Sequence, residues 1–171
     1  MRAVVKIIGD VVANVRAEYD TVDNEKPYYD YGHIFDITDR LQEKTENPDH
    51  KLKQFPLILV IQDFPERFDE NLINRSVEGL TMFLCTETKH NYKPDERYTN
   101  TFENILYPVY ELLFKYLKQS TEIDKESLAH EKYDRLFFGK YDIYGNKVLT
   151  FNKYIDVIEI IFDKITFLQT C

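Results

Sequence analysis

Apolar residues recur at every third or fourth position through the first twenty residues of the chain. The stripe they form consists of Val4, Ile8, Val11 and Val15, flanked by Val5 and Val12. This spacing lays one apolar face along a helix, which we predict over Val4 to Tyr19. Since β-branched residues have low helix propensity, packing against the rest of the chain must hold this helix.

Three segments that follow have the patterns of strands. Tyr28 to Asp39 is rich in aromatic and β-branched residues and is bounded by polar stretches. Phe55 to Ile61 is a continuous apolar run, typical of a central strand covered on both faces, with Pro56 at its start, where a missing N–H is tolerated. Ser76 to Thr88 alternates imperfectly, and its nearness in sequence predicts that it runs antiparallel to the preceding strand.

The second half begins with another helical pattern. Apolar residues at helical spacing extend from Phe102 to Leu117, and Pro108 inside the pattern is expected to kink the helix or restart it near Tyr107. Two segments between the patterned regions, Asp63 to Asn74 and His90 to Thr99, are polar and contain proline. They are therefore predicted to be loops.

The last third of the chain is less regular. Ser120 to Asn146 has no clear period, apart from a turn predicted at Asp142 to Asn146. Val148 to Thr170 is rich in Ile and Phe and predicts a strand or a pair of strands. Periodicity alone leaves open a helix over Tyr154 to Lys164.

The order of these elements predicts the fold class. Strands joined by loops instead of crossover helices form antiparallel sheets, so we expect an α+β fold. An N-terminal helix and a second long helix should pack against the sheet. Neither repeats nor breaks in composition divide the chain, so residues 1–171 are expected to form a single domain.

Composition and charge narrow the range of functions. Thirty acidic and 22 basic residues give a formal net charge of -8, so phosphate-driven binding to nucleic acid is disfavoured. The apolar runs are too short for a membrane span, and the first ten residues lack the core of a signal peptide. With only two cysteines, Cys85 and Cys171, a reducing compartment is expected and a disulfide framework is not.

The most specific catalytic pattern combines Asp63, after the central strand, with Glu87 and Lys89 at the end of the next one. An acid followed by Glu-x-Lys on an adjacent strand is the outline of restriction-type nucleases, whose carboxylates hold a divalent cation while the lysine helps to activate water. About one Glu-x-Lys is expected by chance in a chain of this composition, and no basic groove is evident. A small metal-dependent nuclease is therefore the alternative function and not the leading one.

The sequence shows no other residues in a pattern typical of catalysis, metal binding or phosphate binding. The histidines have no spacing that would converge on a metal, and no glycine-rich phosphate loop is present. Cys85 is expected to be a small buried strand residue. We therefore predict no cofactor, no metal site and no catalytic residue.

Tyrosines are unusually frequent, and seven of them lie in or beside predicted loops. These are Tyr28, Tyr29, Tyr31, Tyr92, Tyr98, Tyr141 and Tyr144. Rigid amphipathic rings in such places commonly make contacts between subunits, and each is equally suited to cap the edge of the core with its hydroxyl in water. Taken together, the tyrosines favour an interaction protein.

Several segments taken together resemble the tail-terminator and neck-ring proteins of tailed bacteriophages. The segments are Val4 to Tyr19, Tyr31 to Ile37, Phe55 to Leu59, Leu80 to Thr88, Glu96 to Tyr98 leading into Phe102 to Pro108, and Asn152 to Ile160. The resemblance covers most of the chain as a pattern of elements. It is strongest for versions from phages of A+T-rich Bacteroides-type hosts, such as crAss-like phages.

The resemblance implies a non-enzymatic virion protein, assembled in the host cytoplasm, that forms a homo-oligomeric ring in the neck or at the tail end. Its neighbours would be portal, adaptor or tail proteins. DNA would pass through the channel without specific binding, since a lumen lined with carboxylates repels phosphates. A cytosolic adaptor that does not assemble is a third hypothesis, which the oligomeric state separates from the ring.

The same resemblance singles out three segments of the chain. A head-to-tail ring needs two different and complementary patches on each subunit, for which Gln42 to Gln54 and Asn91 to Tyr98 are candidates. Ser120 to Asn146 (residues 120–146) is longer than a minimal tail terminator needs. It is expected to be an insert that docks a neighbouring ring or tail protein.

Overall fold

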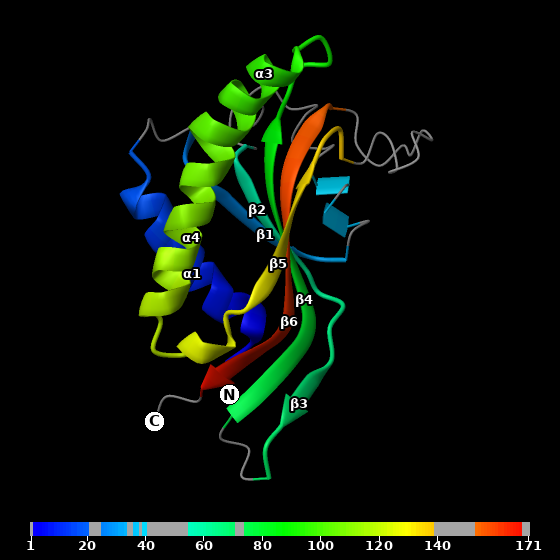
Figure 1. Ribbon diagram of the computed structural model, residues 1–171. Coiled ribbons are helices and arrows are strands. Elements are labelled where there is room, and N and C mark those ends of the chain that lie inside the picture. Colours follow the sequence, from blue (N-terminus) through cyan, green and yellow to red (C-terminus); the bar gives the residue numbers. More distant parts are fainter. Residues whose placement is uncertain are drawn as a thin grey trace.

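Two long helical segments lie against one face of a sheet in the computed structural model of the chain (Figure 1). The structure describes residues 2–20, 25–33, 36–37, 39–40, 55–70, 74–138 and 153–168. Its helices are α1 (Val4–Glu18), α3 (Pro94–Arg97) and α4 (Tyr107–Gln119), with the π-helical segment η2 (Tyr98–Leu106) and the 3-10 turn η3 (Lys125–Ser127). Its strands are β1 (Tyr28–Gly32), β2 (Leu57–Ile61), β3 (Glu66–Phe68), β4 (Asn74–Glu87), β5 (His130–Arg135) and β6 (Ile155–Leu168). The predicted α+β fold is confirmed.

The sheet has six strands and is mostly antiparallel. Its order is β1-β2-β4-β6-β5, and β3 pairs with the first part of β4. β4 and β6 pair over their full lengths, from Asn74 opposite Leu168 to Glu87 opposite Ile155, and form the centre of the sheet. β2 runs antiparallel to β4 as predicted, whereas β1 runs parallel to β2, which the expected antiparallel sheet did not include. A parallel pair needs a long crossover, and the chain between β1 and β2 is long enough to make one.

The first strand ends sooner than its sequence suggests. Gly32 has a φ of 136°, which a glycine adopts easily, and it is the last residue of β1. The N–H of Ile37 then donates to the carbonyl of His33 at 3.1 Å, which is a helical bond. Ile37 is fully buried, so its side chain packs in the core, but the residue lies in a helical turn and not in the predicted strand.

Both segments predicted as loops contain regular structure. The segment from Asp63 to Asn74 includes β3, in which Glu66 lies opposite Val77 of β4. The segment from His90 to Thr99 includes α3, because Pro94 stands in the first turn of a helix, where a missing N–H costs nothing. The helical segments are continuous from α3 to the end of α4.

The change of hydrogen bonding near Pro108 agrees with the sequence. The α-helical pattern restarts at Tyr107, as predicted, with Pro108 in the first turn of α4. The preceding segment, η2, has π-helical bonding, a form that is rare and usually short. The helix therefore accommodates the proline by changing its bonding pattern and does not end there.

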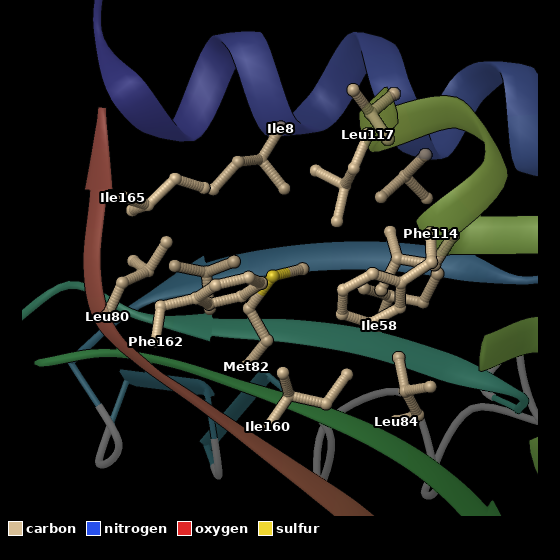
Figure 2. Close-up of a cluster of buried hydrophobic side chains, with 14 of the residues drawn as sticks. Ile8, Ile58, Leu80, Met82, Leu84, Phe114, Leu117, Ile160, Phe162 and Ile165 are labelled. Carbon is tan, nitrogen blue, oxygen red and sulfur yellow. The ribbon is translucent and has the colours of Figure 1, made fainter. Parts of the chain in front are cut away.

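The main core lies between the helices and the sheet. Figure 2 shows Ile8 of α1 and Leu117 of α4 above Met82 and Phe162 of the two central strands. The predicted stripe of α1 is buried in this cluster, as are Leu80, Met82 and Leu84 of β4. The alternate residues Phe83 and Cys85 belong to a smaller cluster on the opposite face, so the predicted alternation of β4 is confirmed.

In both central strands, the positions whose side chains point toward the helices shift by one residue near a glycine of β4. Val77 and Leu80 of β4 are both buried in the main core, although they are an odd number of positions apart, and so are Ile165 and Phe162, which lie opposite them in β6. Gly79 stands between the two halves with a φ of 67°, a conformation that suits glycine. This residue lets both ends of the central strands direct apolar side chains toward the helices.

The C-terminal region is a single strand where it is described. β6 covers Ile155–Leu168, so the structure excludes a helix over Tyr154 to Lys164. The segment expected to be an insert is described as far as Phe138 and contains η3 and β5, which pairs with β6. Its remainder lies outside the described residues, as do the candidate ring segment from Gln42 to Gln54 and Val148 to Asn152. None of the described helices is long and apolar enough to cross a membrane.

Candidate assembly surfaces

The two carboxylates of the nuclease hypothesis lie far apart. Val60 of β2 is opposite Met82 of β4 in an antiparallel register, so Asp63 lies beyond the end of β2 that faces the middle of β4. Glu87 is the last residue of β4 and lies toward the opposite end of β2. Measured along the strand, it is at least roughly 15 Å from Asp63. It forms an ion pair with Lys153, whose Nζ is 2.8 Å from Oε2.

The remaining candidates for chemistry do not gather either. The ammonium of Lys89 lies 5.5 Å from the ring centre of Tyr92. Within the described ranges, no three His, Cys, Asp or Glu side chains are placed to hold a metal ion. Cys85 is buried, as predicted, and burial raises the pKa of its thiol, so the reactive thiolate is disfavoured.

The tyrosines of β1 serve the edge of the subunit's own core. Tyr29 donates from its hydroxyl to the carbonyl of Val5 at 2.7 Å, and its ring lies so close to α1 that a Cβ at Gly9 would come within 3.1 Å of it. Burial raises the pKa of Tyr29. Tyr98 differs from them, because it is 48% exposed at the start of η2. Tyr141 and Tyr144 lie outside the described residues.

A buried ion pair joins the long helix to the central strand. Asp156 is fully buried and lies on the helix side of β6, the same side as Ile158. The Nε atom of Arg97 is 3.4 Å from its Oδ2, the hydroxyl of Thr101 donates to Oδ2 at 3.2 Å, and the N–H of Phe137 donates to Oδ1 at 3.1 Å. The guanidinium of Arg97 also lies 4.0 Å from the ring centre of Phe137.

This buried cluster has a positioning role. A charge removed from water requires partners that remain in place, so Arg97 and Asp156 fix α3 against the end of β6. The sequence signal for it is weak, because the largely apolar run from Ile155 to Ile160 contains two carboxylates, Asp156 and Glu159, and the sequence does not show which of them is buried. No motif marks Asp156, and nothing in the sequence identifies Arg97 and Thr101 as its partners.

The end of the molecule that this cluster positions carries an acidic surface. We define the acidic end patch as the exposed side chains Asp95, Glu96, Tyr98 and Glu103 of α3 and η2; the exposed Lys89 and Lys93 lie at the same end and offset part of its charge. α3 lies at the top of the view in Figure 1. The patch overlaps the segment from Asn91 to Tyr98, which was predicted to make a ring contact.

The opposite end of the sheet carries a different surface. A hollow of about 300 Å³ is lined by Arg67, Phe68, Asp69, Asn74, Arg75, Ser76, Lys164 and Thr166, which we call the cationic hollow. Three of its side chains are cations and one is a carboxylate. Glu78 pairs with Arg67 at 3.1 Å and Glu66 with Arg75 at 3.0 Å, so that together with Asp69 three carboxylates balance the three cations. Phe68 is 44% exposed beside the hollow, on β3 at the bottom of the view in Figure 1.

The molecule therefore has two unlike end surfaces and no assembled catalytic group among its described residues. Comparison with protein-family models, with curated proteins and with solved structures found no match. The functional argument consequently depends on the geometry of the chain itself.

Proposed function

We propose that this chain is a structural ring subunit of a tailed-bacteriophage virion, in the head-tail connector, the neck or the tail end, with a channel for DNA. The observation that carries the proposal is the pair of unlike surfaces at the two ends of the central strands. A ring of identical subunits in head-to-tail contact needs two such surfaces on each subunit. The α+β fold agrees with what the resemblance implied.

The separation of the two surfaces suits contacts with two different neighbours. β4 has 14 residues and spans about 45 Å, with the cationic hollow near its first residues and the acidic end patch beyond its last. Each surface presents one exposed aromatic ring, Phe68 at one end and Tyr98 at the other. Buried aromatic rings commonly supply much of the binding energy at the centre of an interface.

The net charge of -8 supports the proposed passage of DNA. A channel wall of the same sign as the phosphate backbone repels it, so DNA slides and does not adhere. The same net charge gives no support to a polyanion substrate, which agrees with a non-enzymatic role.

The first test is the shape and mass of the purified protein. We expect negative-stain images to show rings with a central hole, and light scattering to give a multiple of the subunit mass, either alone or with neighbouring virion proteins. Protein that stays monomeric at high concentration and in the presence of those proteins would contradict the proposal. It would leave the cytosolic adaptor as the better hypothesis.

Charge reversals test the two end surfaces directly. Asp95→Lys and Lys164→Glu should each reduce ring formation, and the double variant should recover part of it if the two ends meet. Lys118→Glu is a matched control, because Lys118 is exposed on α4 outside both surfaces. Equal ring formation by all four variants would show that the end surfaces do not make the contact.

DNA cleavage assays test the nuclease alternative. We expect no cleavage of DNA with Mg²⁺ or Mn²⁺, because Asp63 and Glu87 lie at different parts of the sheet. Metal-dependent cleavage that disappears in Glu87→Ala would contradict a purely structural role.

A further inference from the structure

The open edge of β5 has a self-complementary sequence. Among the described strands, β5 pairs with β6 alone, and residues Glu131 to Asp134 are exposed. The segment from Glu131 to Arg135 reads Glu-Lys-Tyr-Asp-Arg. When this segment is placed antiparallel to a second copy of itself, each acid lies opposite a base and Tyr133 lies at the centre.

The directions of the backbone N–H and C=O groups of β5 also fit such a pairing. The N–H of Thr88 donates to the carbonyl of Tyr154 at 2.9 Å, in register with the β4–β6 pair, so even-numbered residues in this part of β6 bond toward β4 and odd-numbered residues bond toward β5. Tyr133 lies opposite Glu159 in this register and therefore bonds toward β6. In an antiparallel pair the direction alternates, so the N–H and C=O groups of Lys132 and Asp134 point to the open edge.

We propose that two copies of this chain pair through β5, antiparallel, about a two-fold axis that passes beside Tyr133. The backbone of Lys132 then exchanges two hydrogen bonds with the backbone of Asp134 of the partner subunit, and the symmetric pair makes two more. Their side chains lie on one face, while Glu131 and the partner subunit's Arg135 lie opposite each other on the other face. The two sheets become one continuous sheet.

The charges select this register over its neighbours. A two-fold axis moved by one residue would place Lys132 opposite its own copy, or Asp134 opposite its own copy, and like charges in direct opposition destabilise a sheet. Charged residues usually keep exposed strand edges apart. Lys132 and Asp134 already pair with each other within the subunit, at 2.6 Å, and their order makes one arrangement of two copies favourable because each then also faces the opposite charge of the partner subunit.

Tyr133 is suited to the centre of the contact. It is 38% exposed, its hydroxyl donates to the carboxylate of Glu131, and the guanidinium of Arg135 lies 4.6 Å from its ring centre. Arg135 is held in turn by Glu159, at 2.7 Å. The central ring is therefore already oriented in the subunit before a partner arrives, which lowers the entropy cost of binding.

The pairing does not depend on the proposed ring function. It uses the side of the sheet and neither of the two end surfaces, so both contacts are possible in one assembly. A pair of rings with dihedral symmetry would contain both. Loss of the β5 contact and loss of ring closure are distinguished by variants at separate places.

Charge reversal with complementation is the decisive experiment. Lys132→Asp and Asp134→Lys should each weaken dimerisation by about tenfold to a hundredfold, measured by sedimentation equilibrium, because two cross-strand pairs become repulsive. An equal mixture of these two variants should regain wild-type affinity as a heterodimer. The double variant, in which the two residues are exchanged, should also dimerise normally. A wild-type chain that stays monomeric, or a mixture no tighter than its components, would overturn the proposal.

A disulfide test reports the register of the pair. The two-fold axis brings the Cα atoms of the two Tyr133 residues to about 4.5 Å, which is within the range for a disulfide bond. In a Cys171→Ser background, Tyr133→Cys should give a covalent dimer on mild oxidation. Glu131→Cys is the matched control, because the two copies of Glu131 would be roughly 13 Å apart along the strands. Equal rates of cross-linking by the two variants would rule out this register.

Discussion

The Nε atom of Arg97 lies 3.4 Å from Oδ2 of Asp156, and this contact joins α3 to β6 where the arginine side chain is 9% exposed and the aspartate side chain is fully buried. The pair is closed to water, so each ion depends on the other. Buried ion pairs contribute little net stability compared with apolar residues of the same size, but a broken pair is costly. The contact therefore constrains where the helix sits more than it strengthens the fold.

Removal of the carboxylate should expose that cost. We expect Asp156→Ala to lower the free energy of unfolding by about 3–5 kcal/mol, measured by urea denaturation, because the Arg97 guanidinium would stay buried without its partner. Asp163→Ala is the matched control, since Asp163 is an exposed acid on the same strand and should change stability by less than about 0.5 kcal/mol. Similar effects of the two changes would contradict this account.

A double replacement tests the effect of removing both charges of the pair. Arg97→Met combined with Asp156→Leu removes both charges and keeps apolar volume at both positions. We expect it to recover most of the stability lost in Asp156→Ala, because no buried charge is left unpaired. A double variant that is less stable than Asp156→Ala would show that the pair itself holds the structure.

Gly79 should be sensitive to backbone conformation and not to space. It has a φ of 67°, and a Cβ added there would meet nothing within 4 Å. Gly79→Ala should therefore cost about 1–2 kcal/mol, the usual penalty for a left-handed conformation with a side chain. Gly79→Asn should cost less, because asparagine tolerates this region better. Thermal unfolding of the two variants measures the difference, and equal losses would point to another cause.

Glu18 should make stability depend on pH. Its carboxylate accepts hydrogen bonds from Lys115 at 2.6 Å and Tyr116 at 2.5 Å, which join α1 to α4 and lower its pKa from the ordinary value of 4.5. A carboxyl group with a lower pKa in the folded state stabilises the fold above its unfolded pKa, and this contribution is lost as the pH falls through the folded pKa.

The melting temperature of Glu18→Gln should consequently be below that of the wild type at neutral pH. The difference should shrink as the pH falls below about 4.5, because both proteins then lack the charge. Glu111→Gln on α4 controls for the loss of one exposed acidic charge. A difference that stays constant from neutral to acid pH would contradict a role for the ionised form.

Cys85 should react with thiol reagents only after unfolding. Its side chain is buried in the cluster on the outer face of the sheet, and burial raises the pKa of the thiol. In a Cys171→Ser background, we expect no labelling by a thiol reagent under native conditions and complete labelling in denaturant. Rapid labelling of the native protein would show that this face opens.

The sequence predicts best those elements that bury one continuous face. The stripe of α1 and the alternation of β4 each have the period of one kind of element, and the apolar run of β2 is short, rich in β-branched residues and bounded by polar segments, as a buried strand is. β5 was not found because an edge strand of Glu, Lys, Tyr, Asp and Arg has no apolar alternation. α3 is hard to predict because a proline such as Pro94 is typical of loops, although proline also favours the first turn of a helix.

The candidate surfaces were less accessible to sequence reasoning. Asp156 could have been noticed as a charge between apolar neighbours in β6, but the strand has other charges, and the partner Arg97 comes from a segment that only the tertiary fold brings near. The tyrosines of β1 looked like surface residues, yet Tyr29 has its hydroxyl bonded to α1. By contrast, the charge order of β5 is visible in the sequence once its strand is known.

The nine residues of η2 have a consequence for the direction of the helix tip. A π-helical turn holds more residues than an α-helical turn, so η2 changes the angle between the side chains before it and those after it. Deleting one residue from η2 would change the angle of α3 relative to α4 and carry Arg97 away from Asp156. The number of residues in this segment, as well as their identity, sets the angular position of everything that precedes it on the helix.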